Sequence, residues 1–204
     1  MNHTKILRIS IFPLLFLGLL LLIVSDNTQL LLGSKKSVVY TYTFNLLKGE
    51  IGTGYGAGQA QGLSGQDLLP GDIILGGYPN CAYGKYSHAG LYIGNNEVLE
   101  GYVDYGLSKQ ELAHYMDYSQ LCVLRVEADP KIKQQAVAYA MRFEGSCFYP
   151  VAFKAGDRYW NCSKIIWKAY LQQGINLDPN NDLWIAPESF CYGPHVIKVF
   201  EKGN

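Results

Sequence analysis

The residue types around Cys162 are those that a thiol nucleophile needs. Asn161 is a good helix N-cap, so Cys162 is expected in the first turn of a helix. Free backbone N–H groups at a helix N-terminus lower the pKa of a thiol and can bind a developing oxyanion. The other four cysteines lie in a predicted loop, in a strand, after a helix end and near the last strand (Cys81, Cys122, Cys147, Cys191). A buried structural cysteine is the alternative for Cys162.

A base for this thiol is predicted in the segment YSHAGLYIGNNEVLE, residues 86–100. Two apolar runs flank the residues Gly94, Asn95 and Asn96, which favour the positive φ angles of a tight hairpin turn. A hairpin pairs residues that are symmetric about its turn, so His88 comes close to Glu100 or its neighbours. The carboxylate can then accept the imidazole N–H and fix its tautomer. His88 alone would be more typical of a strand rim, and Glu100 is what favours a base.

The elements that must position these residues form an α+β arrangement. A first helix begins at Pro130 with Asp129 as N-cap, and a second follows Asn161 and stops by Gly174. A short helix capped by Ser108 is predicted to reach Tyr115. Strands are predicted over residues 73–75, 89–93, 98–102, 121–126 and 196–200, with extended chain over 103–107.

The first 66 residues are expected to lie outside the compact domain. Residues 1–25 have a basic flank followed by an almost wholly apolar run, which indicates a signal peptide or a membrane anchor, and the sequence favours neither. A buried helix is disfavoured because the run has no polar face. Residues 26–66 are predicted to be a stalk, with a β-prone run over 38–44, and a Gly-rich linker. The compact domain is predicted over residues 67–204.

The composition excludes some classes of function. Lys+Arg 17 balances Asp+Glu 17, and no basic stripe is present, so a nucleic-acid partner is not expected. Five cysteines leave at least one free thiol in an exported protein, and the pairing of the others stays open. The spacing of Cys and His predicts no structural metal site.

Three segments together resemble a known family. They are LLPGDIILGG (68–77), YSHAGLYIGNNEVLE (86–100) and WNCSKIIWKAYLQQGINL (160–177). They resemble the NlpC-type papain-like cell-wall peptidases, in which the cysteine helix precedes the histidine strand. Here the histidine comes first, which resembles the circularly permuted branch: the YiiX-like amidases and, more distantly, the lecithin–retinol acyltransferase group. The resemblance covers roughly residues 68–200.

This resemblance implies a permuted papain-like fold, in which an antiparallel sheet or half-barrel packs against the nucleophile helix. It implies Cys162 as nucleophile, His88 as base and Glu100 as orienter, with no metal or other cofactor. Tyr149 and Tyr86 would line the substrate pocket, and core packing is the alternative for Tyr149. Lys164 departs from the family pattern, and it would either favour anionic substrates or face solvent.

The implied activity is that of a cysteine amidase or peptidase acting on a cell-wall peptide or a related amide. A lipid acyl hydrolase or acyltransferase is the alternative, with a lipid amide or ester as substrate. A non-catalytic binding domain of the same fold is a third reading, and the complete Cys–His–Glu set argues against it. The N-terminal segment predicts a secreted or membrane-anchored protein with its catalytic domain outside the cytoplasm. Oligomeric state is not predicted.

Overall fold

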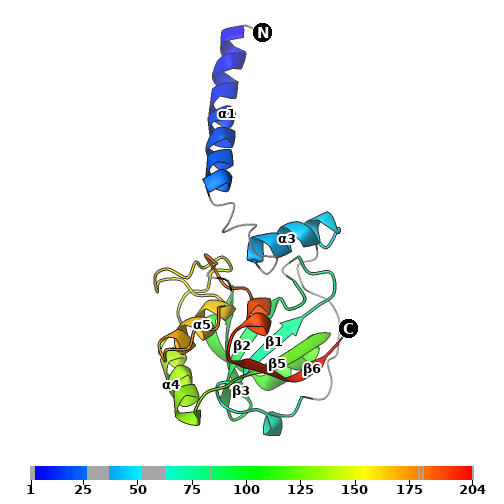
Figure 1. Cartoon of the computed structure of the whole chain (residues 1–204), viewed down its shortest axis with the longest axis vertical. Coiled ribbons are helices and arrows are strands. Elements are labelled where there is room, and N and C mark those ends of the chain that lie inside the picture. Colours follow the sequence, from blue (N-terminus) through cyan, green and yellow to red (C-terminus); the bar gives the residue numbers. More distant parts are fainter. Residues whose placement is uncertain are drawn as a thin grey trace.

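A six-stranded antiparallel sheet is the centre of the molecule (Figure 1). The computed structural model describes residues 3–26, 37–51, 63–82, 84–178, 180 and 182–203. The strand order across the sheet is β4-β3-β2-β1-β5-β6. The strands are β1 (Ile73–Gly77), β2 (His88–Gly94), β3 (Glu97–Tyr102), β4 (Gly106–Glu111), β5 (Gln120–Val126) and β6 (Val196–Lys202). All five strand pairings are antiparallel, as the family resemblance implied.

Two helices cover one face of this sheet (Figure 1). They are α4 (Pro130–Met141) and α5 (Cys162–Leu171), and both begin at the predicted caps. Asp129 accepts a hydrogen bond from the Lys131 N–H, and Asn161 accepts one from the Lys164 N–H. Apolar side chains of both helices and of β1, β2 and β5 form the main core. Burial of this surface is the main force that fixes α5 against the sheet.

A smaller core lies on the other face, where the 3-10 helix η2 (Leu112–Asp117) packs. Leu112 and Tyr115 of η2 are buried against Ile74, Tyr92 and Val98 of the sheet. The predicted helix start at Ser108 was wrong, because residues 106–111 instead pair with β3 as an edge strand. Residues 103–105, predicted to be extended, form the turn between these strands.

The β-prone run over residues 38–44 is helical, so the prediction of extended chain there was wrong. Helix α3 (Val38–Leu47) begins after Ser37, whose side chain accepts a hydrogen bond from the Tyr40 N–H. The Val38 N–H donates to Asp182 at 3.0 Å, and the Asn45 amide donates to the Ala82 carbonyl at 3.3 Å. Docking on the domain therefore overrides the β propensity of the run.

Helix α1 (His3–Asp26) extends away from the sheet domain (Figure 1). Its described side chains, at 11 and 13–25, are exposed, so the alternative of a buried domain helix is not observed. Within the described ranges, no helix meets the combined length and hydropathy needed to cross a membrane. The rest of the predicted stalk and most of the Gly-rich linker lie outside the described residues.

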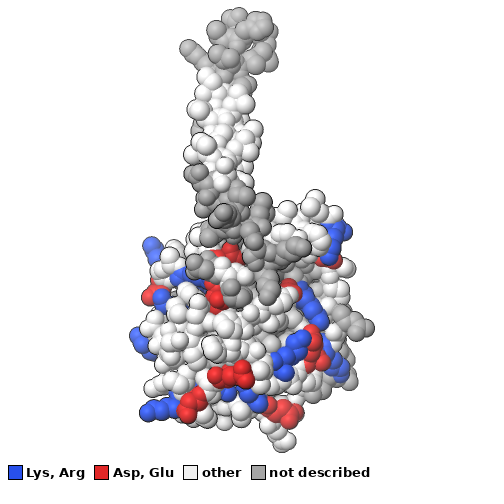
Figure 2. All heavy atoms as spheres, in the orientation of Figure 1, with Lys and Arg blue, Asp and Glu red and all other residues white. Residues whose placement is uncertain are grey.

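Charges of both signs are interspersed over the face of the domain in Figure 2. This distribution agrees with the balanced composition, in which acidic and basic residues are equal in number. Two short 3-10 helices complete the described elements: η1 (Gly65–Asp67), which leads into the domain, and η3 (Pro187–Tyr192), which precedes β6.

Candidate active site

The entry to α5 holds Cys162 in place. Phe148 and Trp160 form a parallel bridge, and the Tyr149 N–H donates to the Trp160 carbonyl at 2.7 Å. Asn161 caps the helix with its side-chain oxygen and donates its amide N–H to the Pro150 carbonyl at 3.2 Å. Cys162 is thereby fixed in the first turn, and only 8% of its surface is exposed.

His88 and Glu100 are brought together by the β2–β3 hairpin. Leu91 lies opposite Leu99 and Tyr92 opposite Val98, so alternation places His88 and Glu100 on the same face of the sheet. Their side chains meet, with 2.7 Å between His88 Nε2 and Glu100 Oε2. Glu100 is fully buried and His88 nearly so.

The nucleophile candidate and the base candidate come from opposite faces of the sheet. Alternation places His88 on the η2 face, whereas Cys162 belongs to the core between the sheet and α5. The two side chains meet where β2 begins, and a hydrogen bond from the Ala89 backbone also reaches the thiol. Because Nε2 of His88 is engaged by Glu100, Nδ1 is the ring atom left for the thiol.

The electrostatics of this pair favour the thiolate and the imidazolium. Burial alone opposes the charge on Cys162, but hydrogen bonding to His88 and the charge of His88 outweigh it and lower the pKa of the thiol. Burial likewise opposes the charge on His88, but hydrogen bonds to Cys162 and Glu100 raise its pKa to about 10. Burial would raise the pKa of Glu100, yet hydrogen bonds from His114 and His88 lower it to about 2.

Four aromatic residues around this pair were not singled out from the sequence. The ring of His88 stacks on Tyr102, with 4.7 Å between ring centroids, and it also stacks on Tyr115 and Tyr118. His114 Nδ1 lies 3.2 Å from Glu100 Oε1. Strand alternation could have found Tyr102, two residues after Glu100, whereas His114 required knowing how η2 folds over the sheet.

The two predicted pocket residues have different surroundings. Tyr149 lies beside the entry to α5 with 55% of its surface exposed, so the alternative of core packing is excluded for it. The ring of Tyr86 is buried in the main core, and its hydroxyl donates to Glu201 on β6 at 2.8 Å. The structure thus brings Cys162, His88 and Glu100 together, whereas the Tyr86 hydroxyl is hydrogen-bonded to Glu201.

Lys164 does not face solvent. Its side chain is buried, and Nζ donates to the carbonyls of Gly156 at 2.7 Å and Tyr159 at 2.9 Å. The ammonium also lies 5.0 Å from the centre of the Trp160 ring. The prediction that Lys164 faces solvent is therefore wrong, because its ammonium is hydrogen-bonded to the loop that leads into Cys162.

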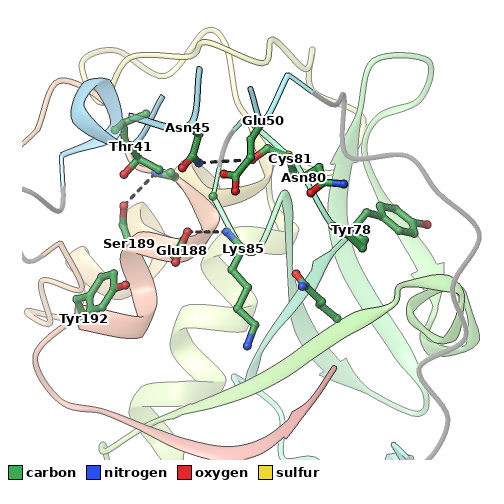
Figure 3. A pocket seen from close by; sticks show the side chains of 15 residues that line it. Thr41, Asn45, Glu50, Tyr78, Asn80, Cys81, Lys85, Glu188, Ser189 and Tyr192 are labelled. Carbon is green, nitrogen blue, oxygen red and sulfur yellow. Dashed lines mark hydrogen bonds between the residues drawn. The ribbon is translucent and has the colours of Figure 1, made fainter. Parts of the chain in front are cut away.

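A separate cavity of about 310 Å³ lies under α3 (Figure 3). Side chains of α3, of the loop before β2 and of η3 line it, and Glu188 there accepts a hydrogen bond from the Lys85 N–H at 2.8 Å. None of Cys162, His88 and Glu100 lines this cavity. In the part of the chain that the structure describes, no three His, Cys, Asp or Glu side chains are arranged to hold a metal ion.

Comparison with known proteins gives a family match and a likeness to solved structures. The family described as permuted papain-like amidase enzyme, YaeF/YiiX, C92 family, matches residues 68–184. The crystal structure titled metalloprotein yiiX from Escherichia coli O157:H7 is similar, with a TM-score of 0.57 and 18% sequence identity over 68% of this chain and 99% of that chain. No curated protein matches the sequence. At 18% identity, the structural likeness supports a shared fold and nothing more.

Proposed function

Because the chain belongs to the permuted papain-like amidase family, we propose that it is a cysteine hydrolase that cleaves an amide bond through an acyl-enzyme on Cys162. Membership of the family confirms the predicted permuted papain-like α+β fold and indicates a cysteine-type amidase or peptidase. The observation that supports the finer proposal best is the contact between His88 and Glu100 at 2.7 Å, next to a thiol whose pKa is lowered by that histidine.

In the proposed reaction the Cys162 thiolate attacks the substrate carbonyl and the amide C–N bond breaks. The His88 imidazolium gives its proton to the departing nitrogen, and the acyl group remains on sulfur. Neutral His88 then takes a proton from water, which attacks the thioester and releases the carboxylic acid. Glu100 accepts the Nε2–H throughout, which keeps Nδ1 directed at the sulfur. We assign the oxyanion to the Cys162 N–H at the start of α5.

A cell-wall peptide or a related amide is the proposed substrate, and a lipid acyl bond is the second candidate. The second candidate is favoured by the loop before Cys162, which exposes apolar side chains at Tyr149, Val151, Phe153 and Tyr159. Contiguous exposed apolar side chains are typical of surfaces that meet a partner or a lipid. Incubation with wall fragments and with phospholipid vesicles, followed by mass spectrometry, separates the two. Release of peptides without fatty acid removes the lipid candidate, and the reverse removes the peptide candidate.

The apolar N-terminal helix is proposed to direct the protein to or across a membrane. The basic flank and apolar run of residues 1–25 support this proposal, as do the exposed apolar side chains of α1. The mass of the mature protein and its distribution between soluble and membrane fractions test it. A full-length protein found only in the soluble cytoplasmic fraction would contradict it.

Alkylation of the cysteines tests the catalytic proposal. Iodoacetamide is expected to modify Cys162 at neutral pH faster than Cys147, the exposed cysteine, although Cys162 is buried. The substitution His88→Ala is expected to abolish this preference. If Cys162 reacts no faster than Cys147, or reacts equally in the His88 variant, the residues form a binding domain and the hydrolase proposal is overturned.

A further inference from the structure

Glu100 connects two histidines that lie in very different surroundings. One oxygen, Oε2, is 2.7 Å from Nε2 of His88, and the other, Oε1, is 3.2 Å from Nδ1 of His114. The His88 side chain is 9% exposed and the His114 side chain is 41% exposed, while Glu100 has no exposed surface. The carboxylate therefore joins the buried imidazole to one that reaches solvent.

The backbone that carries His114 is held against the sheet. His114 lies in η2, where the neighbouring Leu112 and Tyr115 are buried. The Leu112 N–H donates to the Asn96 carbonyl at 2.8 Å, which ties η2 to the turn between β2 and β3. The hairpin that carries His88 and Glu100 thus also positions His114.

An ionised Glu100 satisfies all of the hydrogen bonds around it when both histidines present an N–H group to its oxygens. His88 Nε2 and His114 Nδ1 both donate to it, and the Tyr102 hydroxyl donates to Oε2 at 3.2 Å. Tyr102 also lies 3.1 Å from His114 Nδ1, which can share its proton between the two acceptors. A buried carboxylate that accepts three donors is stabilised in its charged form.

The charges of Cys162, His88 and Glu100 balance only when a protonated His114 is counted with them. With a thiolate at Cys162 and an ionised Glu100, His88 supplies one positive charge against two negative charges. A protonated His114 supplies the second positive charge from the solvent side. An unbalanced buried charge is costly, so this second cation favours both ionised Glu100 and the thiolate.

No other group that faces Glu100 and His114 in the described part of the chain supplies this second positive charge. The tyrosine hydroxyls keep their protons, because burial raises the pKa of Tyr102, Tyr115 and Tyr118. Asp117 lies on η2 and its charge favours the protonated form of His114. The titratable groups that face Glu100 and His114 are therefore His88 on β2, Cys162 on α5, Tyr102 on β3, and Tyr115, Asp117 and Tyr118 on or next to η2.

We propose that His114 is a positioning residue that keeps Glu100 ionised and directed at His88. The inference rests on the proposed function, since it concerns the same Cys162–His88 pair. It adds His114 to the proposed set of Cys162, His88 and Glu100. The pKa values agree with it: the hydrogen bond from His114 is the largest influence that lowers the pKa of Glu100, and the bond to Glu100 raises the pKa of His114.

The test is the pH dependence of Cys162 alkylation by iodoacetamide in the full chain. In His114→Ala the loss of a nearby cation is expected to raise the pKa of both Glu100 and Cys162, so the acid limb of the reaction moves up by about one pH unit. His114→Asn keeps a donor near the place of Nδ1 and loses the charge, so it is expected to retain part of the shift. A matched control is His195→Asn, in the turn before β6, which is expected to leave the limb unchanged.

Several results would overturn the inference. If both His114 variants react with the wild-type pH dependence, or if they lose amplitude without any shift, His114 has a structural role only. An independent readout is the titration of His114 by NMR, which is expected above the ordinary histidine pKa of about 6.5 and lower in Glu100→Gln. An unchanged titration in that variant would overturn the inference whether or not Cys162 is a nucleophile. If the His114 titration shifts in Glu100→Gln as expected but Cys162 is unreactive, the proposed function is overturned and the inference about His114 is not.

Discussion

At the scale of single residues, the opposed pKa shifts of Cys162 and His88 predict a pH window for activity. The rate rises as pH passes the lowered pKa of the thiol, because the thiolate forms. It falls as pH passes about 10, because His88 loses the proton that the leaving nitrogen needs. We expect a bell-shaped profile of kcat/KM with its acid limb below the ordinary cysteine pKa of about 8.5. A single rise centred on that ordinary value would show that His88 does not activate the thiol.

A second prediction at this scale concerns Lys164 and the free energy of unfolding. Lys164→Met keeps the apolar stem and removes the ammonium, which leaves the Gly156 and Tyr159 carbonyls without their donor. The cost is expected to be roughly 1–3 kcal/mol in the free energy of unfolding, measured with urea. Lys168→Met is the control on the same helix, because Lys168 pairs at 3.6 Å with the exposed Asp157 and is expected to cost at most about 1 kcal/mol. Equal losses in the two variants would contradict the assigned role.

At the scale of elements, the cap of α5 links helix stability to reactivity. Asn161→Ala removes the acceptor for the Lys164 N–H and the donor to Pro150, and is expected to cost about 1–2 kcal/mol. Asn161→Asp keeps the acceptor and is expected to recover most of that loss. Alkylation of Cys162 is expected to slow in the alanine variant, because the first turn frays. If Asn161→Ala is destabilised but Cys162 is alkylated at the wild-type rate, the helix cap does not affect the reactivity of Cys162.

How far the sequence predicts these elements depends on how local their signals are. The caps Asp129 and Asn161 and the turn at Gly94, Asn95 and Asn96 are local, and each marks an element that the structure contains. The strand–helix assignment at Ser108 failed because pairing of residues 106–111 with β3 is a tertiary contact. The same holds for residues 38–44, whose helix depends on the domain surface beneath it.

The candidate site divides in the same way. His88 and Glu100 are neighbours across one hairpin, so their contact could be predicted from the spacing about its turn. His114 reaches Glu100 only because η2 folds back over the sheet, and no periodicity in the sequence marks that return. Tyr86 precedes His88 by two residues, yet its hydroxyl is taken by Glu201 from the far end of the chain.

At the scale of the whole molecule, α3 is predicted to be part of the folded domain. Asn45→Ala removes the amide that contacts the Ala82 carbonyl, so amide hydrogen exchange over Val38–Leu47 is expected to accelerate several-fold. Thr43→Ala on the same helix is the control, because the exposed Thr43 donates its hydroxyl to the Val39 carbonyl within α3. Equal exchange in both variants would show that Asn45 does not hold the helix.

The meeting of Cys162 with His88 across the end of β2 has a consequence for how the molecule could be assembled. The part of the chain up to β5 carries His88, Glu100 and His114, and the chain after β5 carries Cys162. Contact between these two parts is made by packing and by the pairing of β5 with β6, not by the peptide bonds that join them. We expect that a chain cut in the link between β5 and α4, at Ala128 and Asp129, yields two inert polypeptides. Mixed together, they would regain a reactive thiol only as they reassociate.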